Sequence, residues 1–369
     1  MRILHLVSSA TLTGPADPAL SLARMQKELL GHDVALAYDT MRPGNLADKG
    51  RGIVTLIDEL ALNTKGGLAL AIRDRKRLQR IAKSFDLVHA HSSHDHALAA
   101  LAGVRPLFRS IHHPRSAERR GAQWVAYRKT DGFFVVAEAH REKLLESYPS
   151  ISSERVFVVP GGVDLERFSP RSGSEFRAAE GVPVDAFVIG MVARFQEGRR
   201  QEDLIDAFAI VRGKSPRPVH LVFIGKGETQ RAIEAHLETR GVRASTTLYG
   251  FRDADLPDAI ASLDLSVLLK EGNDASCRAV LESLAAGVPV VGARYPAIED
   301  ALAGSGAGWI VEPGNVAALS DAILKALQRT GPEFLEMRRL ARARAEVSCD
   351  ERRRAALVDT AYRRTHGRD

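Results

Sequence analysis

The feature that most constrains this 369-residue chain is a regular alternation of short apolar runs with helical patterns, which occurs twice. In the first half, nearly continuous apolar runs stand at 3–9, 33–38, 87–90, 133–137 and 156–160. The alternation restarts after residue 185, with runs at 188–192, 221–225, 265–269 and 288–292. Strands of this kind separated by helices predict parallel sheets that are covered on both faces. The sequence therefore predicts an α/β fold.

One stretch interrupts the alternation, and it indicates a domain boundary. Residues 160–185 are dense in Gly, Pro and Ser, which mark turns and linkers. The chain is also longer than one hydrophobic core usually supports. We expect two parallel-sheet domains, with ligand bound in a central cleft because open sheets bind ligands at the carboxyl ends of their strands.

Composition limits the class of protein and the cellular compartment that we expect. Hydrophobic residues make up 45% and charged residues 27%, and no apolar run approaches the ~20 residues of a membrane helix. Two cysteines, Cys277 and Cys349, cannot form a disulfide framework, so we expect a reducing cytoplasm. The N-terminus predicts a strand rather than a signal peptide. A net charge of +6 allows nucleotides, phospholipids or nucleic acid and selects none of them.

Two helical segments concentrate basic residues. In 68–81, the side chains of Leu68, Ile72, Leu78 and Ile81 can share one helix side, with basic residues elsewhere. The segment 333–366 is also expected to be helical, and ten arginines stand between 338 and 369. Solvated helix faces explain both patterns. The alternative is peripheral contact with an anionic lipid surface, on the inner face of the cytoplasmic membrane.

The strongest chemical signal is the segment 270–289. A buried strand ends in a small polar loop, and a helix is expected to begin near Ser276 or Cys277 and to stop before Gly287. Backbone N–H groups at the helix start suit phosphate or sugar oxygens. Asp274 then lies ahead of the helix and Glu282 about two turns within it. The alternative is that Asp274 or Ser276 only caps the helix while Glu282 is solvated.

A second segment, 190–208, places arginines after a strand. Arg194 directly follows the strand, while Arg199 and Arg200 lie in the loop that leads into the next helix. Cations in such positions neutralise a diphosphate. The alternative is a set of surface arginines paired with Glu197 or Glu202, which would contribute little.

Together these segments resemble family 4 of the retaining glycosyltransferases, which have the GT-B architecture of two Rossmann-like parallel-sheet domains. The family pattern of an acidic residue, seven residues and Glu-Ala-Met-Ala-x-Gly-x-Pro-Val is similar to 274–290. Its Gly-Arg-Leu-x-x-x-Lys-Gly loop is similar to 193–199, and its Pro-Asn-Gly-Val-Asp-x-x-x-Phe motif to 160–168. Further similarities cover nearly the whole chain: 22–23, 31–32, 86–91 (DLVHAH), 223–227 (FIGKG), 250–251, 296–299 and 306–311.

The resemblance implies roles for individual residues. Arg194 and Arg199 would bind the donor's diphosphate, and Glu282 would hold the ribose hydroxyls. Asp274 and His112 occupy positions that contact the donor sugar. Further donor-binding positions are Ser276, Cys277, Arg278, Ala279, Gly14, Gly225, Gly227 and Glu299.

The resemblance also implies the domains and the reaction. Residues 1–165 would bind the acceptor, 166–345 would bind the nucleotide sugar, and the C-terminal helix 346–369 would pack back toward the first domain. We expect a retaining transferase of the hexosyltransferase type, with neither a cofactor nor a metal. Its partners would be a nucleotide-diphosphate sugar and a glycan or lipid-linked acceptor of bacterial envelope polysaccharide or lipopolysaccharide synthesis.

Departures from the family pattern leave two alternatives open. Asp274 is one methylene shorter than the family's glutamate, and Ala275-Ser276-Cys277-Arg278 replaces a common Gly-Phe-Gly-x. This is similar to a branch with the signature Asp-x-x-Cys-Arg-Ala-x-x-Glu. The alternatives are a non-catalytic nucleotide-sugar-binding homologue, and a GT-B enzyme that hydrolyses or phosphorolyses its donor.

Other signals favour simpler explanations. Six histidines lie between 89 and 113, and a zinc site there is an alternative to ordinary packing. The Asp253–Asp255 pair precedes a helix, so capping explains it better than metal binding. Gly225 and Gly227 lack the third glycine of a dinucleotide fingerprint, which disfavours an NAD enzyme. Aromatic residues are only 6% and do not interleave with basic ones, so we expect no nucleic-acid partner.

Overall fold

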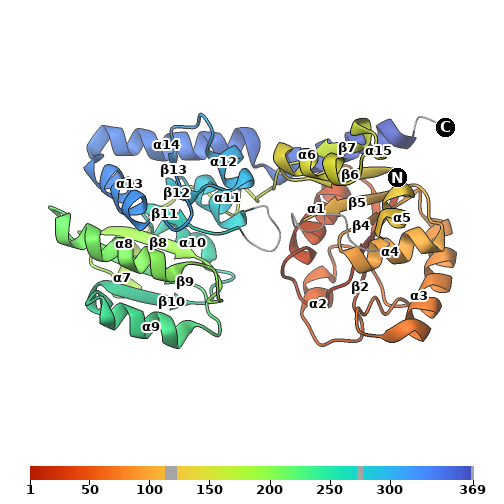
Figure 1. The fold of residues 1–369 in the computed structure, drawn as a ribbon, viewed down its shortest axis with the longest axis horizontal. Helices are drawn as coiled ribbons and strands as arrows, with labels where there is room; N and C mark the ends of the chain where they lie inside the picture. The colour runs from red at the N-terminus through yellow and green to blue at the C-terminus, as the bar shows by residue number, and fades with distance from the viewer. Residues whose placement is uncertain (113–122, 272–276, 367–369) are drawn as a thin grey trace. The chain divides into compact units, whose positions relative to one another are not determined.

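The computed structural model describes residues 1–112, 123–271 and 277–366, and these form two compact α/β units (Figure 1). The first unit contains residues 1–162 and 351–366, and the second contains 163–271 and 277–350. Each unit is built on one sheet whose neighbouring strands are all parallel. The α/β fold with two parallel-sheet units, predicted from the alternation, is confirmed.

The sheet of the first unit has seven strands in the order β3-β2-β1-β4-β5-β6-β7. Its central strands are buried on both faces, as their continuous apolar sequences require. The strands are β1 (Arg2–Val7), β2 (Asp33–Tyr38), β3 (Thr55–Ile57), β4 (Leu87–Ala90), β5 (Leu107–Ile111), β6 (Gly132–Val135) and β7 (Val156–Val158). The helices that precede residue 162 are α1 (Ala16–Glu28), α2 (Leu46–Gly50), α3 (Gly67–Ile81), α4 (Ser93–Ala102), α5 (Gln123–Arg128) and α6 (Glu138–Ser147).

The last helix of the chain, α15 (Glu351–His366), completes the core of the first unit. It packs against α1 and β6, and its residues Ala355, Val358, Ala361 and Tyr362 join a buried cluster with residues of β1, β4, β5 and β6. His32 Nε2 and Asp359 Oδ1 lie 2.7 Å apart, and Arg24 forms an ion pair with the buried Glu351. Residues more than 300 positions apart therefore share one hydrophobic core.

The sheet of the second unit has six strands in the order β10-β9-β8-β11-β12-β13. Its main hydrophobic core is formed by residues of β8, β9, β11, β12, α8, α9 and α13. The strands are β8 (Phe187–Val192), β9 (Val219–Ile224), β10 (Thr246–Gly250), β11 (Leu265–Leu268), β12 (Val290–Ala293) and β13 (Gly308–Val311). The helices are α7 (Ser174–Ala179), α8 (Gln201–Lys214), α9 (Gln230–Thr239), α10 (Leu256–Ala261), α11 (Arg278–Ala285), α12 (Pro296–Leu302), α13 (Val316–Gln328) and α14 (Gly331–Ser348).

The C-terminal segment is two helices, so the prediction of one helical stretch over 333–366 is wrong at one point. α14 ends at Ser348 and α15 begins at Glu351. Between them, the backbone oxygen of Cys349 accepts a 2.7 Å hydrogen bond from Val163 N, and Asp350 forms a parallel β-bridge with Val163. These backbone contacts replace helical hydrogen bonds and separate the two helices.

The predicted apolar side of 68–81 is also divided in the structure. Leu78 is fully buried in the core, whereas Leu68 is 77% exposed and Ile72 is 46% exposed. The helix buries Asp74 and Leu78 and leaves Leu68 and Ile72, in its first two turns, exposed. In the described part of the chain, no helix combines the length and apolarity that crossing a bilayer requires.

Candidate active site

The candidate donor site lies in the second unit, at the carboxyl ends of β8 and β11. These strands are neighbours in the sheet but not in chain order, which makes this edge the topological switch point where open α/β sheets bind their ligands. Arg194 follows β8, while Lys270 and Glu271 follow β11. Arg199 Nη1 donates a 3.0 Å hydrogen bond to the backbone oxygen of Glu271, which ties the two segments together.

The two predicted phosphate-binding arginines differ in how firmly they are held. Arg199 is partly buried and is fixed by its bond to the Glu271 backbone. Arg194 is exposed and lies 3.6 Å from Glu228, while its backbone oxygen accepts a hydrogen bond from Gln201 at the start of α8. The geometry thus brings both cations to one end of the sheet, one preorganised and one able to move.

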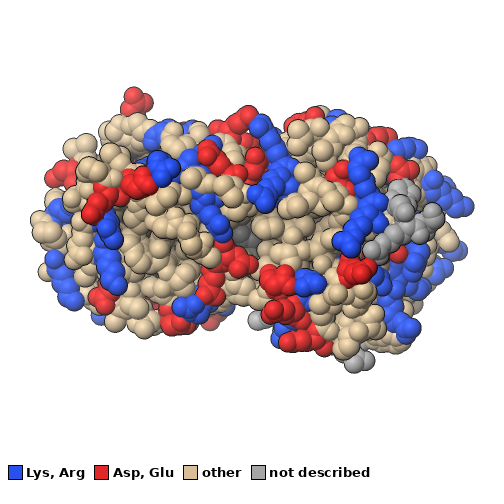
Figure 2. All heavy atoms as spheres, turned by 90° about the horizontal axis from the view of Figure 1, so that it is seen from above, with Lys and Arg blue, Asp and Glu red and all other residues tan. Residues whose placement is uncertain are grey.

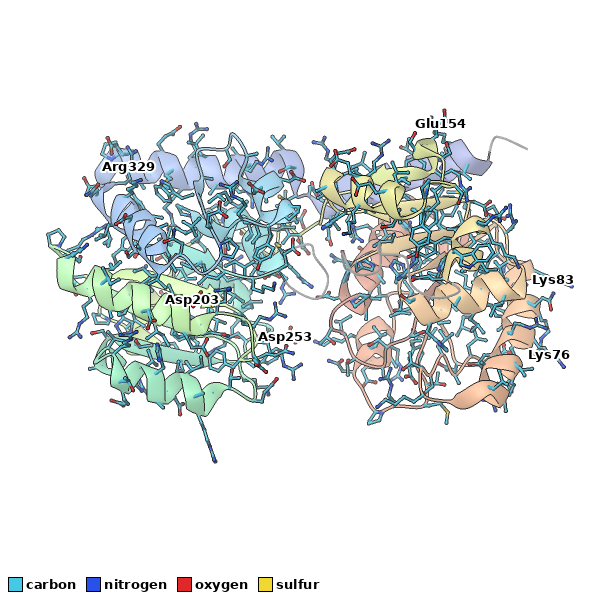
Figure 3. All side chains as sticks on the ribbon, viewed as in Figure 1. Lys76, Lys83, Glu154, Asp203, Asp253 and Arg329 are labelled. Carbon is cyan, nitrogen blue, oxygen red and sulfur yellow. The ribbon has the colours of Figure 1, made fainter. Side chains whose placement is uncertain are left out.

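The residue after Arg199 shapes the turn into α8. Arg200 has a φ of +63°, which is uncommon for a residue with a side chain, and its guanidinium lies 2.6 Å from Asp203 on α8 (Figure 3). Gly198, with a φ of +79°, supplies the other left-handed residue of the turn. The turn therefore depends on backbone conformations that most residues avoid.

Gly225 and Gly227 are required by close backbone packing. A Cβ at Gly225 would lie 2.1 Å from the backbone oxygen of Ala193, and one at Gly227 would lie 2.0 Å from that of Phe195. The segment after β9 therefore presses against the segment after β8, and Phe195 N bonds to the Lys226 oxygen at 3.1 Å. The two glycines position Arg194 through the backbone, whether or not they also approach a ligand.

The predicted helix at the site is α11, which begins at Arg278 after Cys277. Cys277 is buried and left-handed, with a φ of +51°, at the position where the family commonly has glycine. Arg278 Nε donates a 2.7 Å hydrogen bond to Glu282 Oε1 one turn on, and Ala279 lies in the first turn. The Glu282 side chain is only 5% exposed, so the alternative of a solvated Glu282 is excluded.

The remaining predicted residues of the second unit have varied settings. Glu299 lies in the first turn of α12 and forms an ion pair with Arg294, which also binds Glu312. Asp274 and Ser276 lie outside the described residues, so their predicted roles in donor binding or helix capping stay predictions. Asp255 precedes α10 but bonds to Arg252 at 2.8 Å rather than to the helix N-terminus.

In the first unit, β1, β4 and β5 bring four histidines together. His5 lies opposite His89 in the β1–β4 register, while His91 and His112 directly follow β4 and β5. His5 Nδ1 and His91 Nε2 are 2.8 Å apart, and His91 Nδ1 and His112 Nε2 are 3.1 Å apart. Nitrogens of His5, His89 and His91 lie within 4.8 Å of one another.

Burial keeps these histidines neutral. It lowers the pKa of His5 to about 4 and holds the pKa values of His89, His91 and His112 well below the usual range. The positive charges of Arg354 and Arg109 lower the pKa of His112 further. His112 is therefore suited to hydrogen bonding as a neutral ring. Gly14, in the segment after β1, has a φ of +56° with open space beside it.

Sequence reasoning missed His5 and Gln26 as members of this group. Gln26 of α1 lies 2.7 Å from His5 Nε2. The available signal was that His5 and His89 each interrupt an apolar strand. Side chains two residues apart on a strand share a face, which relates His89 to His91. Only the pairing of β1 with β4 places His5 beside these two histidines.

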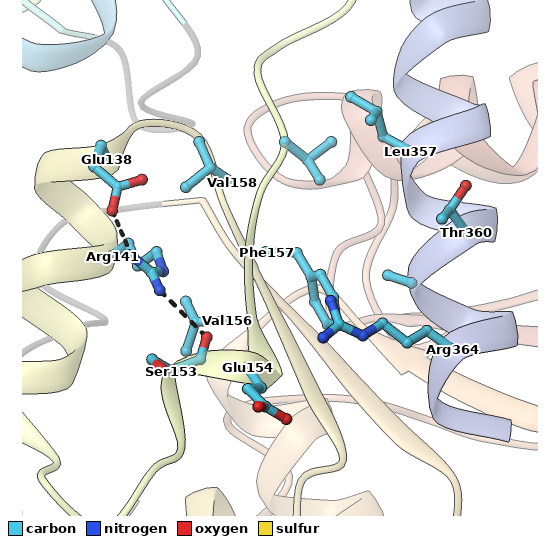
Figure 4. Close-up of a pocket in the computed structure, with 12 residues that line it drawn as sticks. Glu138, Arg141, Ser153, Glu154, Val156, Phe157, Val158, Leu357, Thr360 and Arg364 are labelled. Carbon is cyan, nitrogen blue, oxygen red and sulfur yellow. Dashed lines mark hydrogen bonds and ion pairs between the residues drawn. The ribbon is translucent and has the colours of Figure 1, made fainter. Parts of the chain in front are cut away.

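A pocket of about 480 Å³ lies elsewhere on the first unit, between α6, β7 and α15 (Figure 4). Arg141 binds Glu138 and the Ser153 backbone on one side, and Leu357, Thr360 and Arg364 of α15 form the other. None of its lining residues is a predicted site residue. The pocket is therefore not part of the donor site that the sequence motifs predict.

With this geometry in place, comparison with known proteins gives the class. Residues 173–346 match the family model for glycosyl transferases group 1, and residues 19–167 match the model for glycosyltransferase family 4. The chain has the GT-B fold, and matches to a glycosyltransferase family 4 segment and a glycosyl transferases group 1 segment follow one another along it.

Individual relatives agree with this assignment. The chain is 27% identical over 267 residues to the D-inositol 3-phosphate glycosyltransferase of Corynebacterium urealyticum, across 65% of this chain and 62% of that protein. It is 24% identical to the Escherichia coli UDP-Gal:alpha-D-GlcNAc-diphosphoundecaprenol alpha-1,3-galactosyltransferase, across 69% of this chain and 70% of that protein. The fold matches Anabaena HepE, solved in complex with UDP, with a TM-score of 0.80 at 19% identity, across 98% and 99% of the chains.

Proposed function

We propose that this protein is a retaining, metal-independent hexosyltransferase. It takes its sugar from a nucleotide-diphosphate donor and passes it to a glycan or lipid-linked acceptor in bacterial envelope polysaccharide or lipopolysaccharide synthesis. The observation that carries this proposal is the guanidinium of Arg199, held by the Glu271 backbone where the segments after β8 and β11 meet. The Escherichia coli relative, whose acceptor is diphosphoundecaprenol-linked, supports the acceptor class.

The arginines account for departure of the leaving group. When the bond between sugar and phosphate breaks, negative charge grows on the diphosphate and positive character grows on the anomeric carbon. Arg194 and Arg199 place two positive charges at the end of β8, and a fixed charge in a site that excludes water stabilises such a transition state strongly. Guanidinium groups fit phosphate oxygens in a bidentate way, so charge neutralisation needs no metal in this scheme.

Glu282 and Asp274 would hold the donor's two sugars. Glu282 would accept hydrogen bonds from the ribose hydroxyls, with its carboxylate oriented by Arg278. Asp274 and the neutral His112 would contact the transferred sugar, where a carboxylate favours oxocarbenium character. In a front-face reaction the leaving phosphate oxygen accepts the proton of the attacking acceptor hydroxyl. The new glycosidic bond then forms on the face from which the phosphate departs, without a protein nucleophile.

A panel of nucleotide sugars tests the activity. The protein would be incubated with UDP- and GDP-sugars, with and without envelope extract, and with EDTA in a parallel set. We expect sugar transfer that needs the extract and persists in EDTA. Nucleotide binding without turnover would support a non-catalytic homologue, release in water alone would support a hydrolase, and loss of activity in EDTA would contradict metal independence.

The substitution Asp274→Asn tests the sugar-contacting carboxylate. It removes the charge and keeps the size, so we expect nucleotide affinity to stay within about twofold while turnover falls at least about tenfold. Unchanged turnover would remove Asp274 from the reaction. Nucleotide affinity is measured by thermal shift, because a ligand stabilises the folded state that binds it.

We further propose that α3 brings the enzyme to an anionic membrane. Leu68 and Ile72 are exposed on its first turns, and Arg75 and Lys76 follow at helical spacings of seven and eight residues from Leu68, so they share its side. Lys76 and Lys83 project outward from this region (Figure 3). In the view of Figure 2, basic side chains also gather along the right-hand border, over the first unit.

The lipid proposal is tested by sedimentation with vesicles. Burying a Leu or Ile side chain contributes about 1.5–3 kcal/mol, and each basic residue near an anionic surface about 1 kcal/mol. Leu68→Gln with Ile72→Gln should therefore lower the fraction bound to phosphatidylglycerol vesicles at least about tenfold. Leu101→Gln, at a 59% exposed leucine of α4, is the matched control. Equal binding by all variants would contradict the proposal.

A further inference from the structure

Three buried histidines and one glutamine form a continuous hydrogen-bonded line across the first sheet. Gln26 of α1 contacts His5 in β1 at 2.7 Å, His5 contacts His91 at 2.8 Å, and His91 contacts His112 at 3.1 Å. All three imidazoles are at most 5% exposed. Apolar residues normally fill such positions, so a line of polar rings in a strand core requires a reason beyond packing.

The direction of each hydrogen bond follows from the amide of Gln26. Its Nε2 donates toward the hydroxyl of Tyr362, so its Oε1 accepts from His5 Nε2–H. A neutral imidazole has one donor and one acceptor. His5 Nδ1 must therefore accept from His91 Nε2–H.

The same rule continues to the end of the line. His91 Nδ1 must accept from His112 Nε2–H. The other nitrogen of His112, Nδ1, is then left without a hydrogen and can only accept. A sugar hydroxyl is the kind of donor that this lone pair suits.

We propose that Gln26, His5 and His91 are positioning residues that fix the Nε2–H tautomer of His112. The catalytic meaning of this relay rests on the proposed contact of His112 with the donor sugar, but the tautomer itself does not. His89 stands beside the relay rather than in it: it stacks on His91 with ring centroids 4.2 Å apart and bonds to Tyr362 and Ser110.

The charges around the relay favour neutral rings. Burial lowers the pKa of each histidine, and the guanidinium of Arg354 lowers the pKa values of His5, His91 and His112 further. A relay of neutral rings transmits direction because each ring has only one proton to place. A protonated ring would donate from both nitrogens, so donor and acceptor nitrogens would no longer alternate along the line.

A metal ion is the competing explanation, since nitrogens of His5, His89 and His91 lie within 4.8 Å of one another. The geometry favours hydrogen bonds. Two nitrogens bound to a tetrahedral zinc at about 2.0–2.1 Å would be roughly 3.3 Å apart, whereas His5 Nδ1 and His91 Nε2 are 2.8 Å apart. The stacked rings of His89 and His91 also do not converge on one point.

The tautomer can be read directly by long-range ¹H–¹⁵N correlation spectra of the full chain labelled with ¹⁵N-histidine. His112→Asn assigns the His112 signals by their disappearance. In the unsubstituted protein we expect the proton on Nε2 of His5, His91 and His112. A proton on His112 Nδ1 would overturn the proposal, and this measurement does not depend on any variant folding.

Gln26→Leu tests whether Gln26 sets the direction. The buried His5 Nε2–H would lose its acceptor, and an unsatisfied buried donor is rarer in proteins than an unsatisfied acceptor. The protons should therefore move to the Nδ1 side of all three rings, and turnover should fall about tenfold with the donor KM within about twofold. Met25→Leu, which changes a buried residue of the same helix, should change neither the tautomer nor turnover.

The remaining outcomes are distinguishable. If Gln26→Leu leaves His112 in the Nε2–H form, or if the purified protein carries stoichiometric zinc whose removal by chelation shifts the three histidine signals, the relay is wrong. If the tautomer reverses as expected but the parent protein transfers no sugar, the relay stands and the proposed function fails.

Discussion

Mild acid should unfold the first unit before the second, because five histidines of the first unit are buried and neutral. Burial lowers the pKa of His5 to about 4 and holds those of His89, His91, His96 and His112 well below the usual range. Their unfolded pKa is about 6.5. Below that pH the histidines bind protons in the unfolded chain but not in the folded unit. The free energy of unfolding that they contribute is therefore fully present above pH ~6.5 and is lost as the pH falls.

The size of the effect follows from the same shifts. For His5, lowering the pH from 7 to 5 removes about 2 kcal/mol, and the lowered pKa values of His89, His91, His96 and His112 act in the same direction. Asp95 opposes this trend, because burial raises its pKa to about 6, and its protonation on acidification returns about 1 kcal/mol. The loss from His5 alone exceeds what Asp95 returns, so the balance is a net loss of stability, measured against the 5–15 kcal/mol that stabilises a typical domain. The second unit has His220 as a buried histidine with a lowered pKa and should lose far less.

The two tryptophans allow each unit to be followed separately, since Trp124 lies in the first and Trp309 in the second. Trp309→Phe leaves a probe of the first unit, and Trp124→Phe leaves a probe of the second. Urea titrations at pH 7, 6 and 5 give the free energy of unfolding for each. A first-unit free energy that does not change across this range, or a second unit that is equally sensitive, would refute neutral burial as the cause.

Two further substitutions test the donor half. Arg199→Ala should weaken UDP binding about 10–100-fold and uridine binding little, because a charge-assisted bond to phosphate contributes about 1.5–3 kcal/mol. Arg231→Ala on α9 is the surface control. If Arg199→Ala weakens UDP and uridine binding equally, Arg199 does not belong to the phosphate site. Cys277→Gly should be about 1 kcal/mol more stable than Cys277→Ala, because the φ of +51° strains any side chain, offset in part by glycine's unfolded entropy. The control is Ala235→Gly within α9, where glycine should make the protein less stable than alanine does. A Cys277→Ala protein at least as stable as the Cys277→Gly protein would contradict backbone strain at Cys277.

The strands that the sequence predicted are those with strong apolar signals. The runs at 33–38, 87–90 and 265–269 correspond to β2, β4 and β11. The four missed strands are β3, β5, β10 and β13. They are short, contain Thr, Arg or Gly, and three of them lie at or beside a sheet edge, where tertiary pairing rather than composition decides the conformation. Only the pairing of β5 with β4 and β6 shows that the segment before His112 is a strand.

The candidate site divides in the same way. The start of α11 near Cys277 and the grouping of Arg194 with the loop that holds Arg199 could be read from local order, because both lie where a strand gives way to a helix. The left-handed conformation of Cys277 could not, since it depends on the packing of a buried side chain. Gly225 and Gly227 were predicted as ligand positions, but their backbone contacts to the segment after β8 come from two strands that only the sheet brings together.

The arginines of α14 and the basic residues of α3 make different contacts, although both helices are rich in positive charge. In α14, Arg342 donates to the backbone oxygens of Leu165, Phe168 and Ala285, and Arg344 donates to that of Ala301. A guanidinium that donates to backbone oxygens stabilises the fold and is less available to lipid, so Arg342 and Arg344 do not themselves indicate a membrane surface. On α3 the exposed basic residues accompany exposed Leu68 and Ile72. Charge and exposed apolar surface are common to both helices, because α14 also exposes Leu335 and Val347, and Arg77 of α3 also donates to a backbone oxygen, that of Glu59. What distinguishes α14 is that Arg338, Arg342 and Arg344 all donate to backbone oxygens, so less of its positive charge can meet a lipid surface.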